Sequence, residues 1–93
     1  MNCPVIFFET FRVIEKNNTR RVHLTGIVTG HETFADGSLL TTSPVFYYDE
    51  DKGTIVTKTR SIYQIVVPDF MKKKFELFVK ALDSCNQAIG GPL

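Results

Sequence analysis

The feature that most constrains this chain is a pair of extended segments, 20–32 and 38–48, joined by a strong turn signal. In the first segment Val22, Leu24 and Val28 occupy one phase of a period-two alternation, and mainly polar residues occupy the other. Because successive side chains of a strand point to opposite faces, this pattern indicates an antiparallel strand with one buried face. The Asp36-Gly37 pair supplies the positive φ that a tight hairpin turn needs. The sequence therefore predicts a β-hairpin around which the remaining elements pack.

Another strand is predicted over 4–16, where β-branched and aromatic residues occur in both phases. Such a strand is either covered on both faces or interrupted by a bulge, which we place near Glu9-Thr10. Asn17-Asn18 follows directly, and asparagine tolerates the left-handed backbone of a tight turn. This strand is therefore expected to pair antiparallel with segment 20–32.

Two of the predicted strands contain a discontinuity. Pro44 cannot donate a ladder hydrogen bond, so it predicts an edge position, a bulge or a break within 38–48. A fourth strand is predicted over 54–67, but its apolar phase shifts in the middle, which predicts a kink or short loop at Arg60-Ser61. The acidic run between these two strands predicts a solvated turn.

After Pro68 the period changes from two to about 3.6, which is typical of an amphipathic helix. The apolar stripe of this helix consists of Met71, Phe75, Phe78, Leu82 and Cys85. Asp69 is the expected N-cap, and the helix is predicted over 69–86 with a tail at 87–93. The expected fold class is α+β: a four-stranded antiparallel β-meander, as a twisted sheet or partial barrel, with one C-terminal helix packed on it.

Length and composition limit the classes of function. A chain of 93 residues is expected to form a single domain, 1–93, too small to bury a deep active-site cleft as well as a core. The formal net charge of +1 argues against the bulk electrostatics of a strongly basic nucleic-acid-binding protein. Cys3 and Cys85 favour two free thiols in a reducing compartment over a disulfide between the two ends. With no signal peptide and no run of about 20 apolar residues, we expect a protein of the host cytosol with no membrane partner.

No residue pattern in the sequence predicts catalysis. His23 and His31 would lie roughly 26 Å apart on one strand, too far apart to share a metal ion. The hydroxyls of residues 41–43 have no neighbouring base, which a nucleophile needs. The acidic residues 49–51 lack the alternating oxygen spacing of a calcium loop. We therefore expect no enzymatic activity, no metal and no cofactor.

Two kinds of partner are expected from the surface residues. An exposed strand edge near Pro44 and three tyrosines favour a protein partner, and the edge would also allow a homodimer. The alternative is single-stranded nucleic acid, which binds where cations and stacking rings share one sheet face. The candidate partner-binding residues for the two cases together are Arg21, His23, Tyr47, Tyr48, Asp49, Glu50, Asp51, Lys58, Arg60 and Tyr63.

Two segments carry a further pattern: 30–45, GHETFADGSLLTTSPV, and 57–63, TKTRSIY. Together they resemble the core of small uncharacterised proteins of phages and prophages. The resemblance implies an accessory protein of a mobile element and brings no catalytic residues. By analogy with anti-CRISPR proteins, which block host defence enzymes by binding them, it implies an inhibitor of a host defence complex.

Overall fold

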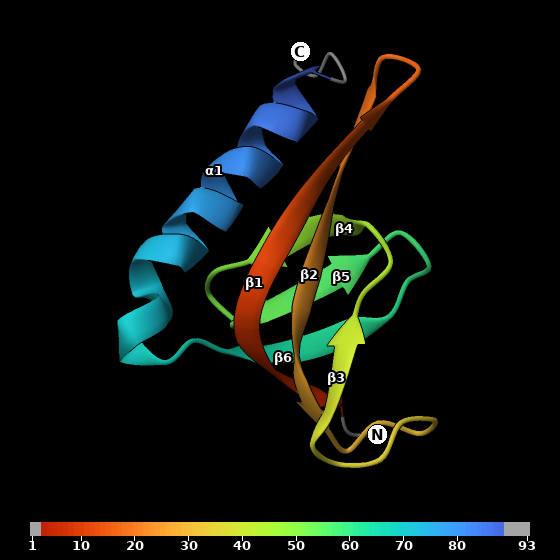
Figure 1. The fold of residues 1–93 in the computed structure, drawn as a ribbon, viewed down its shortest axis with the longest axis vertical. Helices are drawn as coiled ribbons and strands as arrows, with labels where there is room; N and C mark the ends of the chain where they lie inside the picture. Colours follow the sequence, from red (N-terminus) through yellow and green to blue (C-terminus); the bar gives the residue numbers. More distant parts are fainter. Residues whose placement is uncertain (1–2, 89–93) are drawn as a thin grey trace.

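Breaks in the two discontinuous segments decide the architecture of this protein. The structure, a computed structural model, describes residues 3–88 and contains six strands rather than four (Figure 1). The segment 38–48 is split around Pro44, and the segment 54–67 folds back on itself at Arg60, whose φ is 70°. The strands are β1 (Val5–Lys16), β2 (Thr19–Thr29), β3 (Ser38–Thr41), β4 (Val45–Asp49), β5 (Thr54–Thr57) and β6 (Ile62–Val66).

The six strands form one mixed, open sheet in the order β3-β2-β1-β6-β5-β4. Two antiparallel groups, β3-β2-β1 and β6-β5-β4, are joined by a parallel pair between β1 and β6. The predicted α+β class and the antiparallel β1–β2 pair are therefore confirmed, whereas the four-stranded, wholly antiparallel meander is wrong. The physical reason is that the break at Pro44 divides one predicted strand into β3 and β4, and the turn at Arg60 divides another into β5 and β6. As a separate strand, β6 can pair with β1 at the start of the chain.

Local turn signals are placed where the sequence predicted them. Asn17 and Asn18 have φ of 53° and 63°, and the register of β1 against β2 shifts between Phe8 and Thr10. The reversal after β2 is a longer loop than the tight turn predicted, because β2 ends at Thr29 and β3 begins at Ser38. Asp36 closes this loop, since its Oδ1 accepts a hydrogen bond of 2.8 Å from the Gly30 N–H.

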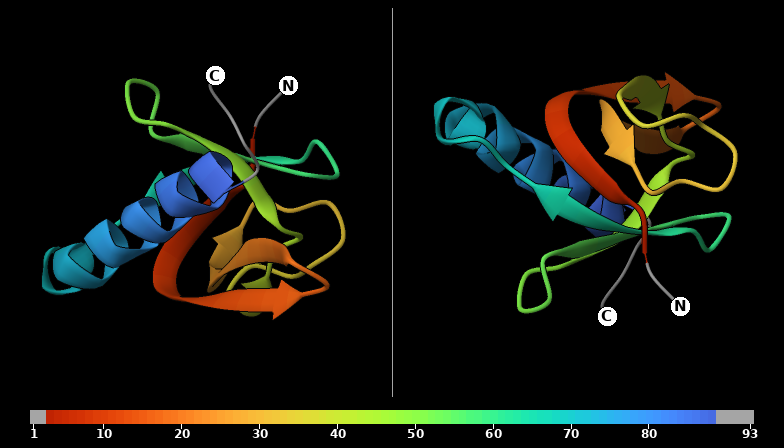
Figure 2. Two further views of the ribbon diagram at one scale, coloured as in Figure 1. Left: turned by 90° about the horizontal axis from the view of Figure 1, so that it is seen from above. Right: turned by 90° about the horizontal axis from the view of Figure 1, so that it is seen from below.

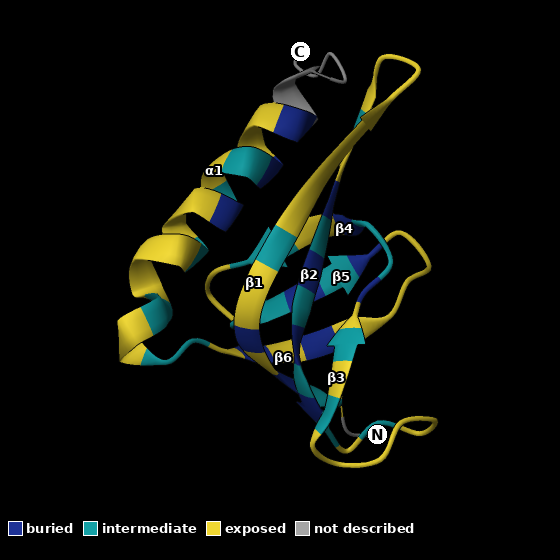
Figure 3. Ribbon diagram, viewed as in Figure 1, coloured by how far each residue is buried: buried dark blue, intermediate teal, exposed yellow. Residues whose placement is uncertain are grey.

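The helix α1 (Lys72–Ala88) packs on the concave face of the folded sheet, where the two strand groups cross (Figures 1 and 2). An aromatic cluster fills this interface: the ring of Phe75 lies 5.3 Å from that of Phe8 and 5.2 Å from that of Tyr48. Phe78 is fully buried, and its ring lies 5.8 Å from that of Phe11. The predicted apolar stripe of the helix is confirmed as the part that enters the core (Figure 3).

The start of the helix differs from the prediction. Residues Asp69–Met71 form a 3-10 turn, η1, and Pro68 stands at the cap position without any side-chain capping bond. Asp69 is therefore not the N-cap; its Oδ1 instead lies 3.2 Å from Lys72 Nζ. At the other end, residues 87 and 88 of the predicted tail belong to α1, and residues 89–93 lie outside the described part of the chain.

Candidate functional site

A continuous row of apolar side chains crosses the sheet face that α1 leaves uncovered. We call this row, Leu39, Ile27, Phe7 and Val66, the outer row. Leu39 is paired with Ile27, Ile27 with Phe7, and Phe7 with Val66, so the row crosses four strands in register. Leu39 is 64% exposed, and Phe7 and Val66 are each 37% exposed. Paired residues of neighbouring strands point to the same face, so these side chains form one surface.

The outer row exists because β1 is apolar in both of its phases. Ile6 and Phe8 point into the core and are fully buried, which directs Phe7 to the opposite face. Two alternatives were open for this strand, cover on both faces or a bulge. The structure has the bulge, and it leaves the second face open to solvent. A contiguous exposed apolar patch of this kind is typical of an interaction site.

The same sheet face carries a second apolar group near the other end of β6. Tyr47 is paired with Val56, and Val56 with Ile62. Tyr47 is 51% exposed and Ile62 45% exposed. Gln64, which donates hydrogen bonds to the carbonyl oxygens of residues 52 and 53, separates this group from the outer row.

A basic pocket of about 250 Å³ opens between the start of β2 and β4. Arg20 and Arg21 of β2 and Lys58, which follows β5, supply three cations. Phe46, which is 67% exposed, and Pro44 supply an apolar wall. The pocket therefore combines cations with an accessible ring.

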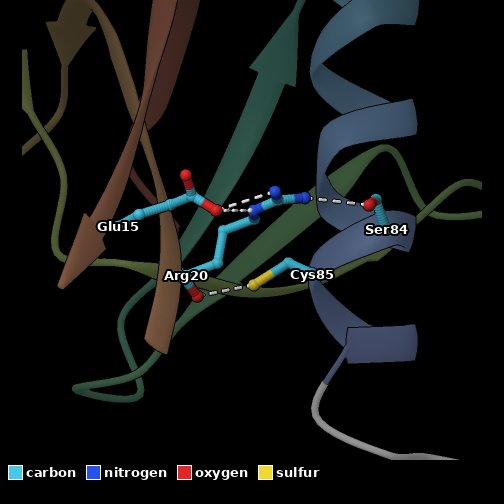
Figure 4. A network of polar contacts seen from close by, with 4 residues as sticks. All are labelled: Glu15, Arg20, Ser84 and Cys85. Carbon is cyan, nitrogen blue, oxygen red and sulfur yellow. Dashed lines mark hydrogen bonds and ion pairs between the residues drawn. The ribbon is translucent and has the colours of Figure 1, made fainter. Parts of the chain in front are cut away.

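A network centred on Arg20 holds the basic pocket together (Figure 4). Its guanidinium donates hydrogen bonds of 2.8 and 3.1 Å to Glu15 Oε2 and one of 3.0 Å to Ser84 Oγ. The thiol of Cys85, which lines the pocket, donates to the carbonyl oxygen of Arg20 at 2.7 Å. The bonds with Ser84 and Cys85 join the β1–β2 hairpin to α1. Cys85 is buried, Cys3 is exposed, and both are free thiols.

The predicted basic residues are only partly brought together. Arg21 and Lys58 line the basic pocket, but Arg60 lies in another pocket, of about 560 Å³, beside His31. His23 Nδ1 is 2.8 Å from the carbonyl oxygen of Thr42, which assigns the ring proton to Nδ1.

The three tyrosines also lie in different surroundings. Tyr47 is exposed on the outer sheet face, whereas Tyr63 is buried and its burial raises the pKa of its hydroxyl. The Tyr63 hydroxyl lies 3.5 Å from His31 Nε2. Tyr48 points inward, and its pKa is raised by burial and then by Glu50 and Asp49.

The predicted acidic residues belong to a turn and a groove. Asp49 Oδ1 accepts a hydrogen bond of 3.2 Å from the Lys52 N–H, and Asp51 is exposed in the turn. Glu50 lines a groove of about 480 Å³ together with Glu76 and Asp83 of α1. Within residues 3–88, no cluster of three or more His, Cys, Asp or Glu residues is arranged to hold a metal ion.

Sequence reasoning selected Arg21 and Lys58 of the basic pocket but missed the outer row and Phe46. The outer row was signalled only by the apolar residues in both phases of β1. Phe46 belongs to an aromatic run, 46–48, whose orientation is reset by a bulge between Val45 and Tyr47. Counting by twos across this run therefore assigns the wrong faces to Tyr47 and Tyr48.

Comparison of the chain with protein families, with curated protein sequences and with solved structures gave no match. The resemblance to phage and prophage proteins thus stays a prediction from two sequence segments. In the part of the chain that the structure describes, no helix combines the length and the apolar character needed to cross a bilayer.

Proposed function

We propose that this protein is a non-enzymatic binding domain that acts by covering part of the surface of a partner protein. The observation that carries the proposal is the outer row, an apolar strip across four strands on the face opposite α1. Burying a large apolar side chain contributes roughly 1.5–3 kcal/mol relative to leaving it in water. Leu39, which is 64% exposed, can supply most of that free energy to a complex, and the partly covered Ile27, Phe7 and Val66 can supply a smaller part.

The strand beside the outer row supports a protein partner in a second way. Among the strands that the structure describes, β3 pairs only with β2, which leaves its other edge without a strand beside it, and Leu39 lies on this edge strand. An open strand edge offers backbone hydrogen bonds to an added strand, while the adjacent side chains supply apolar contacts. The partner we propose is therefore a protein with an apolar surface beside an extended segment.

The more specific form of the proposal comes from the sequence resemblance. It is a phage or prophage accessory factor in the host cytosol that inhibits a host defence complex by binding it, as anti-CRISPR proteins do. A homodimer through the edge of β3 is the other occupant of the same face.

The test compares two variants that make the same chemical change at two places. Leu39→Asp puts a charge into the outer row, and Leu77→Asp puts one on the solvent face of α1, where Leu77 is 57% exposed. Tagged wild type and both variants are used to capture proteins from nuclease-treated bacterial lysate, with mass spectrometry as the readout. We expect wild type and Leu77→Asp to retain the same stoichiometric partner, and Leu39→Asp to lose it at least tenfold.

Size-exclusion chromatography with light scattering on the same three proteins identifies a homodimer. If Leu39→Asp retains the partner as well as Leu77→Asp does, the outer row is not the binding surface and the proposal is wrong. Because both leucines are exposed, we expect thermal unfolding to show changes within about 0.5 kcal/mol for either variant.

A further inference from the structure

The basic pocket lies between two strands of the open sheet, the first half of β2 and β4, that do not pair with each other. β2 extends over Thr19–Thr29, but β3 is paired with it only from Thr25 to Val28. The first half of β2 is therefore without β3 beside it, and β4, at the far edge of the sheet, lies opposite. The pocket is thus formed by backbone elements that the core holds in place.

Two of the three cations in the pocket form no ion pair with a described residue. The guanidinium of Arg20 is occupied by Glu15 and Ser84. Arg21 and Lys58 are exposed and form no ion pair with any described residue. Among residues 3–85 the pocket has no acidic lining residue. Its net charge is therefore positive, and its free cations are available to a phosphate.

An accessible ring adjoins these cations. The bulge in β4 leaves Phe46 67% exposed, and Phe46 lines the same pocket as Arg21 and Lys58. Stacking of a base on an aromatic side chain together with a cation on the backbone is the usual composition of a single-strand binding site.

A further positive group, Arg12, lies beyond the pocket along the hairpin. His23 follows Arg21 by two residues and so lies on the same face of β2. Arg12 of β1 is paired with His23. Arg21 and His23 are about 7 Å apart along the strand. This spacing extends the positive surface beyond one phosphate group and favours a polymer over a single anion.

We infer that the basic pocket binds single-stranded nucleic acid, with one base stacked on Phe46 and its phosphate between Arg21 and Lys58. This function is separate from the outer row, which lies on a different part of the sheet. The positive residues of the hairpin contact the following phosphates. Recognition depends on rings and phosphates, so the site has little base specificity.

The test measures binding of fluorescein-labelled oligothymidylate by fluorescence anisotropy at low and moderate salt. Phe46→Ala is matched by Phe70→Ala, which removes an aromatic ring that is 82% exposed at the start of the helical region. Lys58→Glu is matched by Lys73→Glu on the solvent face of α1. Each pair has the same chemical change, inside and outside the pocket.

We expect Phe46→Ala to weaken binding by about 5- to 150-fold, the loss typical of removing one stacking ring. Lys58→Glu should weaken binding and lower the slope of log affinity against log salt by about 1. Phe70→Ala, Lys73→Glu and Leu39→Asp should all bind within about twofold of wild type. Absence of binding by wild type at low salt, or equal losses within each matched pair, overturns the inference.

Competition with thymidine monophosphate distinguishes two ligands that share a base and a phosphate, a free nucleotide and a nucleic-acid strand. If the mononucleotide displaces the oligomer at a similar concentration, the pocket takes a free nucleotide, and only the phosphate and ring contacts are needed. If only oligomers compete, the hairpin cations contribute and the ligand is a strand. The second result supports the inference, whereas the first overturns a strand as the ligand. Leu39→Asp shows whether the pocket is independent of partner binding.

Discussion

Gly26 of β2 packs directly against β1, so replacing it with alanine tests the packing of the sheet. A Cβ at this position would lie 2.3 Å from the carbonyl oxygen of Phe7 and 2.8 Å from Ile6 Cγ1. Ordinary contact begins at 3.4 Å, so the first distance is short by 1.1 Å. The obstructing atom belongs to the backbone of β1, which is held between β2 and β6. The strand itself would have to move.

Overpacking of this kind typically costs about 1–3 kcal/mol, and more where backbone must shift. Alanine regains about 0.5–1 kcal/mol that glycine loses in a strand. We expect a net loss near 2 kcal/mol, which lowers the melting temperature by roughly 8–16 °C in a domain of this size. Guanidinium and thermal unfolding followed by circular dichroism give both values.

Gly37→Ala is the control for the Gly26 variant. Gly37 has φ of 89° and no atom within 4 Å of a built Cβ, so alanine there meets only backbone strain. That strain costs about 1–2 kcal/mol. A Gly26→Ala protein as stable as wild type would show that β1 and β2 do not approach as described.

Three further predictions concern the core, a buried hydroxyl and pH. Phe78→Ala should lower the free energy of unfolding by about 3–5 kcal/mol in guanidinium titrations, because Phe78 is fully buried in the aromatic cluster. Thr57→Val should cost about 1–3 kcal/mol, because the Ser61 N–H, 3.1 Å from the Thr57 hydroxyl, loses its acceptor. Burial and the nearby Glu50 raise the pKa of Tyr48 above 10.0 in the native state. The native state thus holds the proton more tightly than the unfolded state, and this stability is full below pH 10 and lost above it. Melting temperatures measured above pH 10 should fall less steeply for Tyr48→Phe; equal slopes would contradict the assignment.

The sequence predicted the features that single residues determine. Asn17 and Asn18 make the left-handed turn, Pro44 breaks the third segment, and the bulge in β1 lies beside Glu9. Each of these features depends on the backbone preferences of one or two residues, and these preferences follow from the residue types alone. The stripe of α1 follows in the same way from its period.

The parallel pair of β1 and β6 could not be predicted, because no local preference specifies it. Its register, Val5 with Gln64, depends on how the two strand groups pack against one helix. The surroundings of the candidate site residues could not be predicted for a related reason. Arg21 and Lys58 were chosen for their charge, but the ring beside them, Phe46, depends on a bulge that shifts the alternation by one residue.

The central parallel pair also determines when the chain can finish folding. The β1–β2 hairpin closes through a short turn, an event of microseconds, whereas pairing β1 with β6 must first close a loop that contains most of the chain. Nonlocal pairing of this kind slows folding relative to local contacts. During synthesis one edge of β1 therefore stays unpaired until β6 has left the ribosome. Its inward residues Ile6 and Phe8 stay uncovered until α1 has also been made. A nascent chain stopped before residue 62 would present an apolar strand edge and would be prone to aggregate.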